Sequence, residues 1–211
     1  PHPDDETLGC GGTIAMKKKQ NAAVTIVVMT DGRHSHRKHM NPVDLSEKRK
    51  NELINAASEL GIDRDDLYFL DYEDGHLAFD SDQATKDVLE ILKSKKPEQL
   101  YIPFKREFPL DHRVTNSIVR AAMHKNELRV VVFEYPLWHW MQWPWINNAR
   151  LFRRKMLVLN SIKNACGLRM LSDFNCWIHI SDVLEVKKNA LAQHESQNQR
   201  LLNNRNWQIL S

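Results

Sequence analysis

Short apolar runs alternate along this chain with segments whose apolar residues recur at helical spacing. The runs cover residues 24–30, 67–70, 100–102 and 130–133, and they are rich in β-branched or aromatic side chains. Nearly continuous apolar runs are typical of strands that are covered on both faces, as in a parallel sheet. We therefore predict buried strands at these four positions.

The segments between these runs have the periodicity of amphipathic helices. Leu53, Ala56, Ala57 and Leu60 repeat at helical spacing, and Gly61 offers a C-terminal stop. Two further helices are marked by Val88, Leu89 and Leu92 and by Val114, Ile118 and Ala122. This alternation predicts an α/β fold, a Rossmann-like three-layer sandwich with a mostly parallel sheet. Ligands of such folds bind outside the carboxyl ends of the strands.

The last third of the chain departs from this rhythm. Residues 135–145 are rich in tryptophan and proline, and we interpret them as an irregular excursion. We predict a helix over 150–164, a strand over 177–180 and a helix over 183–194. No repeat or linker divides the chain, so we interpret residues 1–211 as a single domain. The strand expected before Pro1 is not in the sequence, so we expect a domain that lacks its first strand.

The composition is that of a globular protein with one substantial core. Hydrophobic residues make up 42% and charged residues 27% of the 211 positions. The formal charge of +3 and the pI near 8.8 are mildly basic, and a solvated surface explains them without a nucleic-acid partner. No apolar run approaches the ~20 residues of a transmembrane helix.

The cysteine content points to a reducing compartment. Cys10, Cys166 and Cys176 are odd in number and form no CxxC pair, which argues against a disulfide framework. No signal peptide is visible in the sequence. We therefore expect a cytoplasmic protein, and the sequence leaves its oligomeric state open.

The opening segment, PHPDDE, combines residue types that bind metal ions and use them. His2 and Asp5 lie at a predicted strand-to-helix corner, and imidazole nitrogens and carboxylate oxygens are ordinary zinc ligands. Asp4 precedes Asp5, so one carboxylate can bind a metal while its neighbour stays free as a base. An isolated HxDD is more simply explained as a turn with helix-capping carboxylates, so this motif alone does not indicate a site.

A second segment, Asp111-His112, follows the predicted strand at 100–102. A histidine that opens a helix at the carboxyl end of one strand can face a site built by another strand, and Asp111 could orient it. A DH pair alone would be read as a surface histidine. Together, however, the two segments supply two histidines and a carboxylate, and a catalytic zinc typically has three protein ligands and an open position for water.

Taken in order, the motifs of this chain resemble the PIG-L (LmbE-like) family of zinc-dependent N-deacetylases. The family's motifs are (A/P)HPDDE, a glycine-rich turn, TDG, R-x-x-E-x-x-x-A…LG, D-G-x-L, DHR and K-x-x-A-x-x-x-H-x-S-Q. They match residues 1–6, 9–12, 30–32, 49–61, 74–77, 111–113 and 187–197. Any one match could be chance, but the ordered set covers almost the whole chain and is highly specific.

The resemblance implies both a site and a reaction. The zinc ligands that it implies are His2, Asp5 and His112. It implies Asp4 as the catalytic base, and it suggests that Arg49 and Asp74 approach polar groups of the substrate. The implied substrate is an amide, usually an N-acetylglucosamine unit attached to a lipid, a small molecule or a glycan. We therefore expect a Zn²⁺-dependent hydrolase that removes an acetyl group from an N-acetylated amino sugar or sugar conjugate.

One position departs from the family pattern. Many members read H-P-D-H where this chain has proline at Pro109, and the family's first histidine helps to stabilise the tetrahedral intermediate. Proline offers no donor from its side chain or its nitrogen. Either another group supplies this hydrogen bond or the activity is low. The candidate donors, chosen by their region of the sequence, are Arg33, His34, His36 and Lys105.

Two other functions stay open. Pro109 favours a sugar-binding module that kept the metal and lost turnover, whereas Asp4 argues against it because metal binding alone does not need this carboxylate. A metal-dependent phosphoesterase also uses Asp/His clusters, often with two metals. The sequence offers ligands for only one metal, which makes the phosphoesterase the less favoured function.

Three further features have both a structural and a functional explanation. The aromatic excursion either stacks on sugar rings or packs over the core, and its residues are Trp138, Trp140, Trp143 and Trp145. Residues 33–39 (RHSHRKH) form either a lip beside the site or a solvated loop, and we favour the loop. We expect His194 to be structural and to join the last helix to the sheet.

Overall fold

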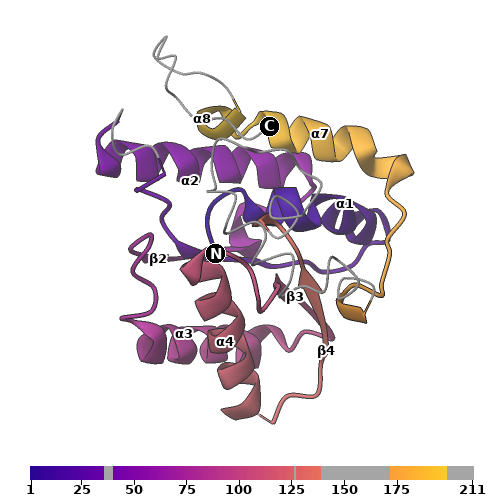
Figure 1. Ribbon diagram of the computed structural model, residues 1–211. Helices are drawn as coiled ribbons and strands as arrows, with labels where there is room; N and C mark the ends of the chain where they lie inside the picture. The colour runs from indigo at the N-terminus through magenta and orange to yellow at the C-terminus, as the bar shows by residue number, and fades with distance from the viewer. Residues whose placement is uncertain (36–39, 126, 139–171, 199–211) are drawn as a thin grey trace.

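The computed structural model describes residues 1–35, 40–125, 127–138 and 172–198, which form a mixed α/β fold (Figure 1). Its first half contains α1 (Asp5–Lys19), β1 (Ile26–Thr30), α2 (Pro42–Glu59), the 3₁₀ turn η1 (Arg64–Asp66), β2 (Leu67–Tyr72) and α3 (Ser81–Lys95). Its second half contains β3 (Gln99–Pro103), α4 (Leu110–Lys125), β4 (Val131–Tyr135), η4 (Ser181–Val183), α7 (Leu184–Ala192) and α8 (Glu195–Asn198).

The strands form two parallel pairs within the described residues. β1 pairs with β2, with Ile26 opposite Leu67, and β3 pairs with β4, with Gln99 opposite Val131. The backbone N–H groups of Met29 and Thr30 both donate to the carbonyl oxygen of Pro1, so the opening segment lies beside the end of β1. The four predicted strands and their parallel pairing are confirmed, and the three-layer sandwich stays a prediction.

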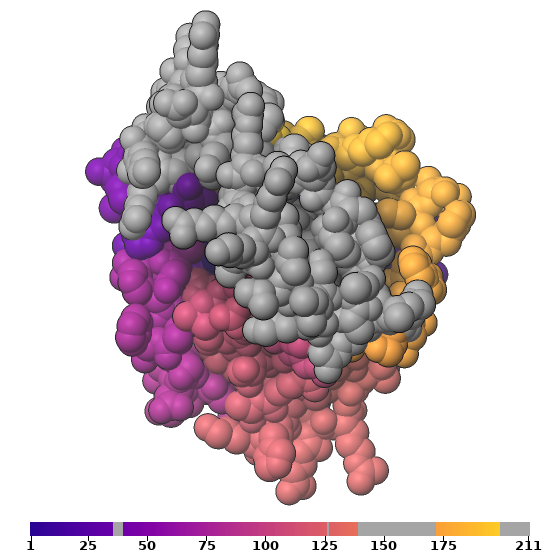
Figure 2. All heavy atoms as spheres, in the orientation of Figure 1, coloured from indigo at the N-terminus to yellow at the C-terminus, as the bar shows by residue number. Residues whose placement is uncertain are grey.

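Buried apolar side chains form two clusters, and β1 contributes to both. Ile26 and Val28 pack with α1, α2 and α7, whereas Val27 and Met29 pack with α3, α4 and β3. This division follows from the two-residue period of a strand, which points successive side chains to opposite faces. Figure 1 shows the same arrangement, with α1, α2 and α7 on one side of the strands and α3 and α4 on the other. In Figure 2, the surfaces of α7 and α4 lie at opposite ends of the view.

Local sequence signals explain where the main helices begin and end. α1 has acidic residues in its first turn and three lysines in its last, and both complement the helix dipole. α2 starts at Pro42, and the side chain of Asn41 accepts a hydrogen bond from Val43 N at 2.8 Å. The helical periodicity of Leu53, Ala56, Ala57 and Leu60 is confirmed, because all four are buried in one cluster.

The later part of the chain contains one wrong prediction. Residues 177–180 are irregular and form no strand, and Trp177 and Ile178 are 84% and 42% exposed. Their composition favours a strand, but no described strand pairs with them, and pairing decides strand formation more than propensity does. The helix predicted over 183–194 is confirmed as α7. The helix predicted over 150–164 and the tryptophans Trp140, Trp143 and Trp145 lie outside the described residues.

Candidate active site

The PHPDD segment forms a tight corner between the end of β1 and the start of α1. The N–H of Asp5 donates to the carbonyl oxygen of His2 at 3.3 Å, and the N–H of Leu8 donates to that of Asp4 at 2.9 Å. Asp4 is buried and has a φ of 136°, a conformation that costs a residue other than glycine on the order of 1–3 kcal/mol. The corner therefore holds a buried carboxylate in a strained backbone, as is common where the structure positions a reactive group.

His2, Asp5 and His112 converge at this corner from two separate parts of the chain. Asp5 Oδ2 lies 3.2 Å from His2 Nδ1 and 3.3 Å from His112 Nε2. The two imidazole rings are 5.3 Å apart between centroids. One donor atom from each residue lies within 4.8 Å of the other two, so the three side chains could hold one metal ion. The structure thus brings together the three residues predicted as ligands.

The environment of His112 supports a metal ligand in this position. His112 is fully buried, and neither of its ring nitrogens makes a hydrogen bond within the described part of the chain. A buried polar atom without a partner costs about 1–3 kcal/mol, and such atoms are rare in native proteins. Burial lowers the pKa of His112 to about 4, so its imidazole is neutral and can bind a metal through a lone pair. The residues present therefore fit a zinc ion.

The other ring nitrogen of His2 faces two carboxylates. His2 Nε2 lies 3.1 Å from Asp74 Oδ1 and 3.5 Å from Asp111 Oδ2. Asp111 Oδ2 also accepts a hydrogen bond from Gly75 N at 2.7 Å, so Asp111 is itself held in place. Metal-binding histidines usually donate their second ring N–H to such a carboxylate, which fixes the tautomer and the ring orientation. The sequence predicted that Asp111 could orient His112, but in the structure the imidazole that Asp111 contacts is that of His2.

Asp4 lies beside the ligand cluster and pairs with Arg49. Arg49 Nη2 is 3.1 Å from Asp4 Oδ2 and donates to the carbonyl oxygen of Pro3 at 2.7 Å. Burial raises the pKa of Asp4 to about 6, although the Arg49 charge opposes the shift. None of the metal-type clusters among the described residues includes Asp4. Asp4 is therefore placed as a buried carboxylate next to the ligands and separate from them.

Gly32 of the TDG motif makes room for Arg49. Arg49 Nη1 donates to the carbonyl oxygen of Gly32 at 3.0 Å. Gly32 has a φ of +67°, and a Cβ at this position would lie 2.5 Å from Arg49 Nη1. Glycine is therefore required here both by the backbone conformation and by the close approach of the guanidinium group.

The described candidates for the donor missing at Pro109 have different surroundings. Arg33 is bound to Asp31, with Arg33 Nε 2.5 Å from Asp31 Oδ2. The backbone N–H of His34 donates to Asp74 Oδ2 at 2.9 Å, which joins His34 directly to a neighbour of His2. Lys105 is exposed. The fourth candidate, His36, lies outside the described residues.

The motif at residues 187–197 connects the last described helices to α1 and α2. His194 is 1% exposed, and its Nε2 lies 3.3 Å from Thr7 Oγ1 and 3.7 Å from Glu6 Oε1. The backbone N–H and the hydroxyl of Ser196 donate to the carboxylate of Glu52 at 2.8 and 2.6 Å. These contacts agree with a structural role for His194, but they join it to the first turn of α1 and not to the sheet, as had been predicted.

Glu6 contacts the corner, and the sequence interpretation did not single it out. Its Oε2 accepts a hydrogen bond from the backbone N–H of Asp4 at 3.2 Å, and its Oε1 accepts one from Thr7 Oγ1 at 2.6 Å. Glu6 thereby holds the backbone of the strained residue that carries the buried carboxylate. Its position at the end of the PHPDDE motif was the only signal in the sequence.

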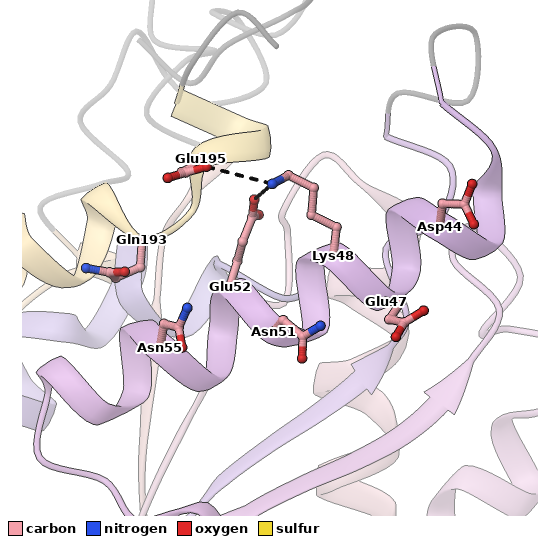
Figure 3. A pocket seen from close by; sticks show the side chains of 8 residues that line it. All are labelled: Asp44, Glu47, Lys48, Asn51, Glu52, Asn55, Gln193 and Glu195. Atoms are coloured by element: carbon pink, nitrogen blue, oxygen red, sulfur yellow. Dashed lines mark ion pairs between the residues drawn. The ribbon is translucent and has the colours of Figure 1, made fainter. Parts of the chain in front are cut away.

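A separate hollow lies on the outer face of α2, beside α7 and α8 (Figure 3). Lys48 bridges its two sides, at 3.2 Å from Glu52 and 3.8 Å from Glu195. The hollow contains no ligand of the buried cluster, and its acidic side chains outnumber Lys48, its one cation. Its lining residues are Asp44, Glu47, Lys48, Asn51, Glu52, Asn55, Gln193 and Glu195.

Comparison with known proteins places this site in a family. The PIG-L model, described as GlcNAc-PI de-N-acetylase, matches residues 1–123, and the chain therefore belongs to the PIG-L family. The matched range contains the whole corner and His112 of α4.

Two curated relatives cover nearly the whole chain. One is the probable N-acetyl-alpha-D-glucosaminyl L-malate deacetylase 2 of Bacillus subtilis (strain 168), 27% identical over 96% of this chain and 82% of the relative. The other is the diacetylchitobiose deacetylase of Thermococcus kodakarensis, 27% identical over 93% of this chain and 67% of the relative.

Solved structures show the same fold. The N,N'-diacetylchitobiose deacetylase of Pyrococcus horikoshii has a TM-score of 0.64 and 22% identity, over 92% of this chain and 67% of its own. GalB, the 4-carboxy-2-hydroxymuconate hydratase of Pseudomonas putida KT2440, also has a TM-score of 0.64, with 16% identity over 92% and 75% of the two chains. A hydratase thus shares this fold with deacetylases, and the side chains of the site must decide the reaction.

Proposed function

We propose that this protein is a zinc-dependent hydrolase that removes the acetyl group from an N-acetylated amino sugar or sugar conjugate. The observation that carries the proposal is the buried His112, which lies beside Asp5 and His2 and whose ring nitrogens make no hydrogen bond to any residue that the structure describes. Asp4 lies next to this set and is not one of the three ligands, so its carboxylate can act as a base. Curated relatives named as deacetylases support the class of substrate.

The proposed mechanism divides the work between metal and carboxylate. A zinc ion held by His2, Asp5 and His112 would polarise the acetamide carbonyl and lower the pKa of a water molecule to about 7. Asp4 accepts the proton of the attacking water, since its raised pKa suits proton transfer near neutral pH. Asp4 then returns this proton to the leaving amine, and the products are acetate and a free amino sugar.

Other residues of the site position the reacting groups. Asp111 orients His2 through Nε2, so the opposite ring nitrogen faces Asp5. We propose that Asp74 accepts hydrogen bonds from substrate hydroxyls, because its side chain is 13% exposed at the edge of the cluster. We propose that Arg49 approaches the substrate's polar groups while its guanidinium group holds the Asp4 carboxylate in place.

The experiment that tests this function is a mass-spectrometric screen for loss of acetyl. The purified chain, supplied with zinc, is incubated with N-acetylglucosamine, diacetylchitobiose and GlcNAc conjugates of a lipid and a small acid. We expect a mass loss of one acetyl group and release of acetate from at least one of them. No deacetylation of any substrate by a zinc-loaded, folded protein would contradict the proposal.

A second candidate is a metal-bearing binding protein with little turnover, and Pro109 favours it. Loss of one hydrogen-bond donor to a developing oxyanion typically costs ~10²–10³ in kcat. The Pro109→His variant tests whether the missing donor limits turnover. A sharp rise in kcat identifies a slow enzyme, whereas parental kcat in this variant indicates that another donor has taken over. In the second case the alanine variants of Arg33, His34, His36 and Lys105 identify that donor.

We also propose that residues 1–211 belong to one deacetylase domain with a three-layer sandwich fold. Contacts of the late helix support this, since Lys187 Nζ donates to the carbonyl oxygen of Leu8 at 2.9 Å. None of the described helices is long and apolar enough to cross a membrane. We keep a cytoplasmic location as a prediction, for which the free cysteines Cys10 and Cys176 give support.

A further inference from the structure

A second group of metal-type side chains lies at the rim of the site, and two of its three members, Glu73 and His76, have no role in the proposed reaction. We propose that His34, Glu73 and His76, here called the rim cluster, bind a second zinc ion that exchanges with solvent. The rim cluster shares no residue with the buried set of His2, Asp5 and His112. This inference goes beyond the proposed deacetylase activity and does not depend on it.

The rim cluster has suitable donors at suitable distances. Glu73 Oε1 lies 3.7 Å from His34 Nε2 and 3.1 Å from His76 Nδ1. Ligands bound 2.0–2.1 Å from a tetrahedral zinc ion are about 3.4 Å apart, so only small shifts of the side chains are needed. Two imidazoles and one glutamate form a ligand set that zinc uses in enzymes, with a fourth position for water.

The hydrogen bond of His34 Nδ1 leaves the lone pair of Nε2 available to a metal ion. His34 Nδ1 lies 2.8 Å from the carbonyl oxygen of Asp74. A carbonyl oxygen can only accept, so Nδ1 carries the proton and the neutral ring has its lone pair on Nε2. That nitrogen is the one that faces Glu73. Donation from the far ring nitrogen to a backbone carbonyl is the usual arrangement behind a metal-bound histidine.

The other two ligands come from one tight turn. The backbone N–H of His76 donates to the carbonyl oxygen of Glu73 at 3.0 Å, which brings their side chains to the same side. Gly75 within this turn has a φ of +81°, and its N–H is held by Asp111. The turn is thus held by Asp111, which also contacts His2 of the buried cluster. The side chains of the turn remain accessible to solvent. The side chains of Glu73 and His76 are 48% and 49% exposed.

An ion in the rim cluster would link the segment after β1 to the turn after β2. His34 already contacts that turn through two hydrogen bonds to Asp74. Exposed ligands are freer to move and better solvated than buried ones, so this ion should bind more weakly than the one in the buried cluster. It should therefore fill last when zinc is added and leave first under a chelator.

Metal titration of the whole chain tests the proposal. The chain is stripped with a chelator and titrated with Zn²⁺, and separately with Co²⁺, whose visible absorption reports tetrahedral binding. We expect two ions per chain, one tight and one weak. His76→Ala and Glu73→Gln should each keep the tight ion and weaken the second by more than the ~10–100-fold that loss of an outer partner costs. His112→Ala should lose the tight ion and keep the weak one.

Matched controls make each outcome decisive. His124 is an exposed histidine in the last turn of α4, and His124→Ala should bind both ions as the parent does. Circular dichroism checks that each variant is folded, and the exposed positions of His76 and Glu73 leave the core unchanged. A parent chain that binds one ion at saturating zinc overturns the proposal. A weak ion that persists unchanged in both His76→Ala and Glu73→Gln also overturns it, because that ion then lies elsewhere.

Discussion

The buried cluster and the rim cluster use the same kinds of ligand in opposite environments. Each has two histidines and one carboxylate with donor atoms within 4.8 Å of one another. His112 is 0% exposed and Asp5 is 3% exposed, whereas Glu73 and His76 have side chains that are about half exposed. Beside the buried cluster lies Asp4, a buried carboxylate that belongs to neither set of ligands and whose pKa is raised by burial.

The difference shows what turns a set of ligands into a reaction centre. Neither ring nitrogen of the buried His112 makes a hydrogen bond to a described residue, so a metal ion is a suitable partner for one of them. Burial also raises the pKa of Asp4 to about 6, within reach of general-base work at neutral pH. The exposed rim cluster has neither property. We therefore assign tight binding and chemistry to the first cluster and exchangeable binding to the second.

The largest expected effect comes from removing a buried ligand. His112→Ala should lose the tight zinc ion and all measurable deacetylation, because two of three ligands remain in a site built for three. Elemental analysis after dialysis measures the zinc, with His124→Ala as the control. Full zinc content in His112→Ala would show that the ligand assignment is wrong.

A smaller loss is expected from Asp111→Asn, which keeps the shape of the side chain and removes its charge. His2 then loses one carboxylate at Nε2, and loss of such an outer partner typically costs 10–100-fold in metal affinity or activity. Asp82→Asn is a matched control, since it changes an exposed aspartate in the first turn of α3. Parental zinc affinity and turnover in Asp111→Asn would reject the orienting role.

Gly32 and Gly61 offer a paired test of the close contact between Gly32 and Arg49. Both have positive φ, so an alanine costs about 1–2 kcal/mol at either position. At Gly32 the new Cβ also meets Arg49, whereas at Gly61 its nearest neighbour is 3.7 Å away. Gly32→Ala should therefore lose more unfolding free energy in urea and also lower kcat. Equal stability loss and parental kcat in both variants would contradict the role of Gly32.

The smallest effect is expected at Trp138, the half-buried tryptophan that follows β4. If its ring stacks on the substrate, Trp138→Ala should raise KM about 2–10-fold, which corresponds to ~0.5–1.5 kcal/mol. The zinc content should not change. Trp177→Ala, at an 84% exposed tryptophan, is the control and should leave KM unchanged. A loss of stability at parental KM would indicate packing over the core.

Patterns within short segments were readable from the sequence, and contacts between distant segments were not. Periodicity was sufficient for the strands and main helices, because each buries one face through its own spacing. The strand predicted over 177–180 failed because strands need a partner that no local pattern reveals.

The same limit applies to the site. Family motifs predicted which residues meet at the buried cluster. They did not predict that Arg49 pairs with Asp4, that Asp111 contacts His2, or that His34 meets Glu73 and His76. Each of these contacts joins segments that only the folded chain brings together.

The most direct test of the central claim measures zinc content and acetate release on the same preparation of Asp4→Asn. Asn keeps the size of the side chain and can still contact Arg49, but it cannot accept a proton. We predict the parental content of tightly bound zinc together with a ~10²–10⁴-fold lower kcat. Deacetylation at the parental rate, or loss of the tight zinc, would show that Asp4 is not a base acting beside the metal.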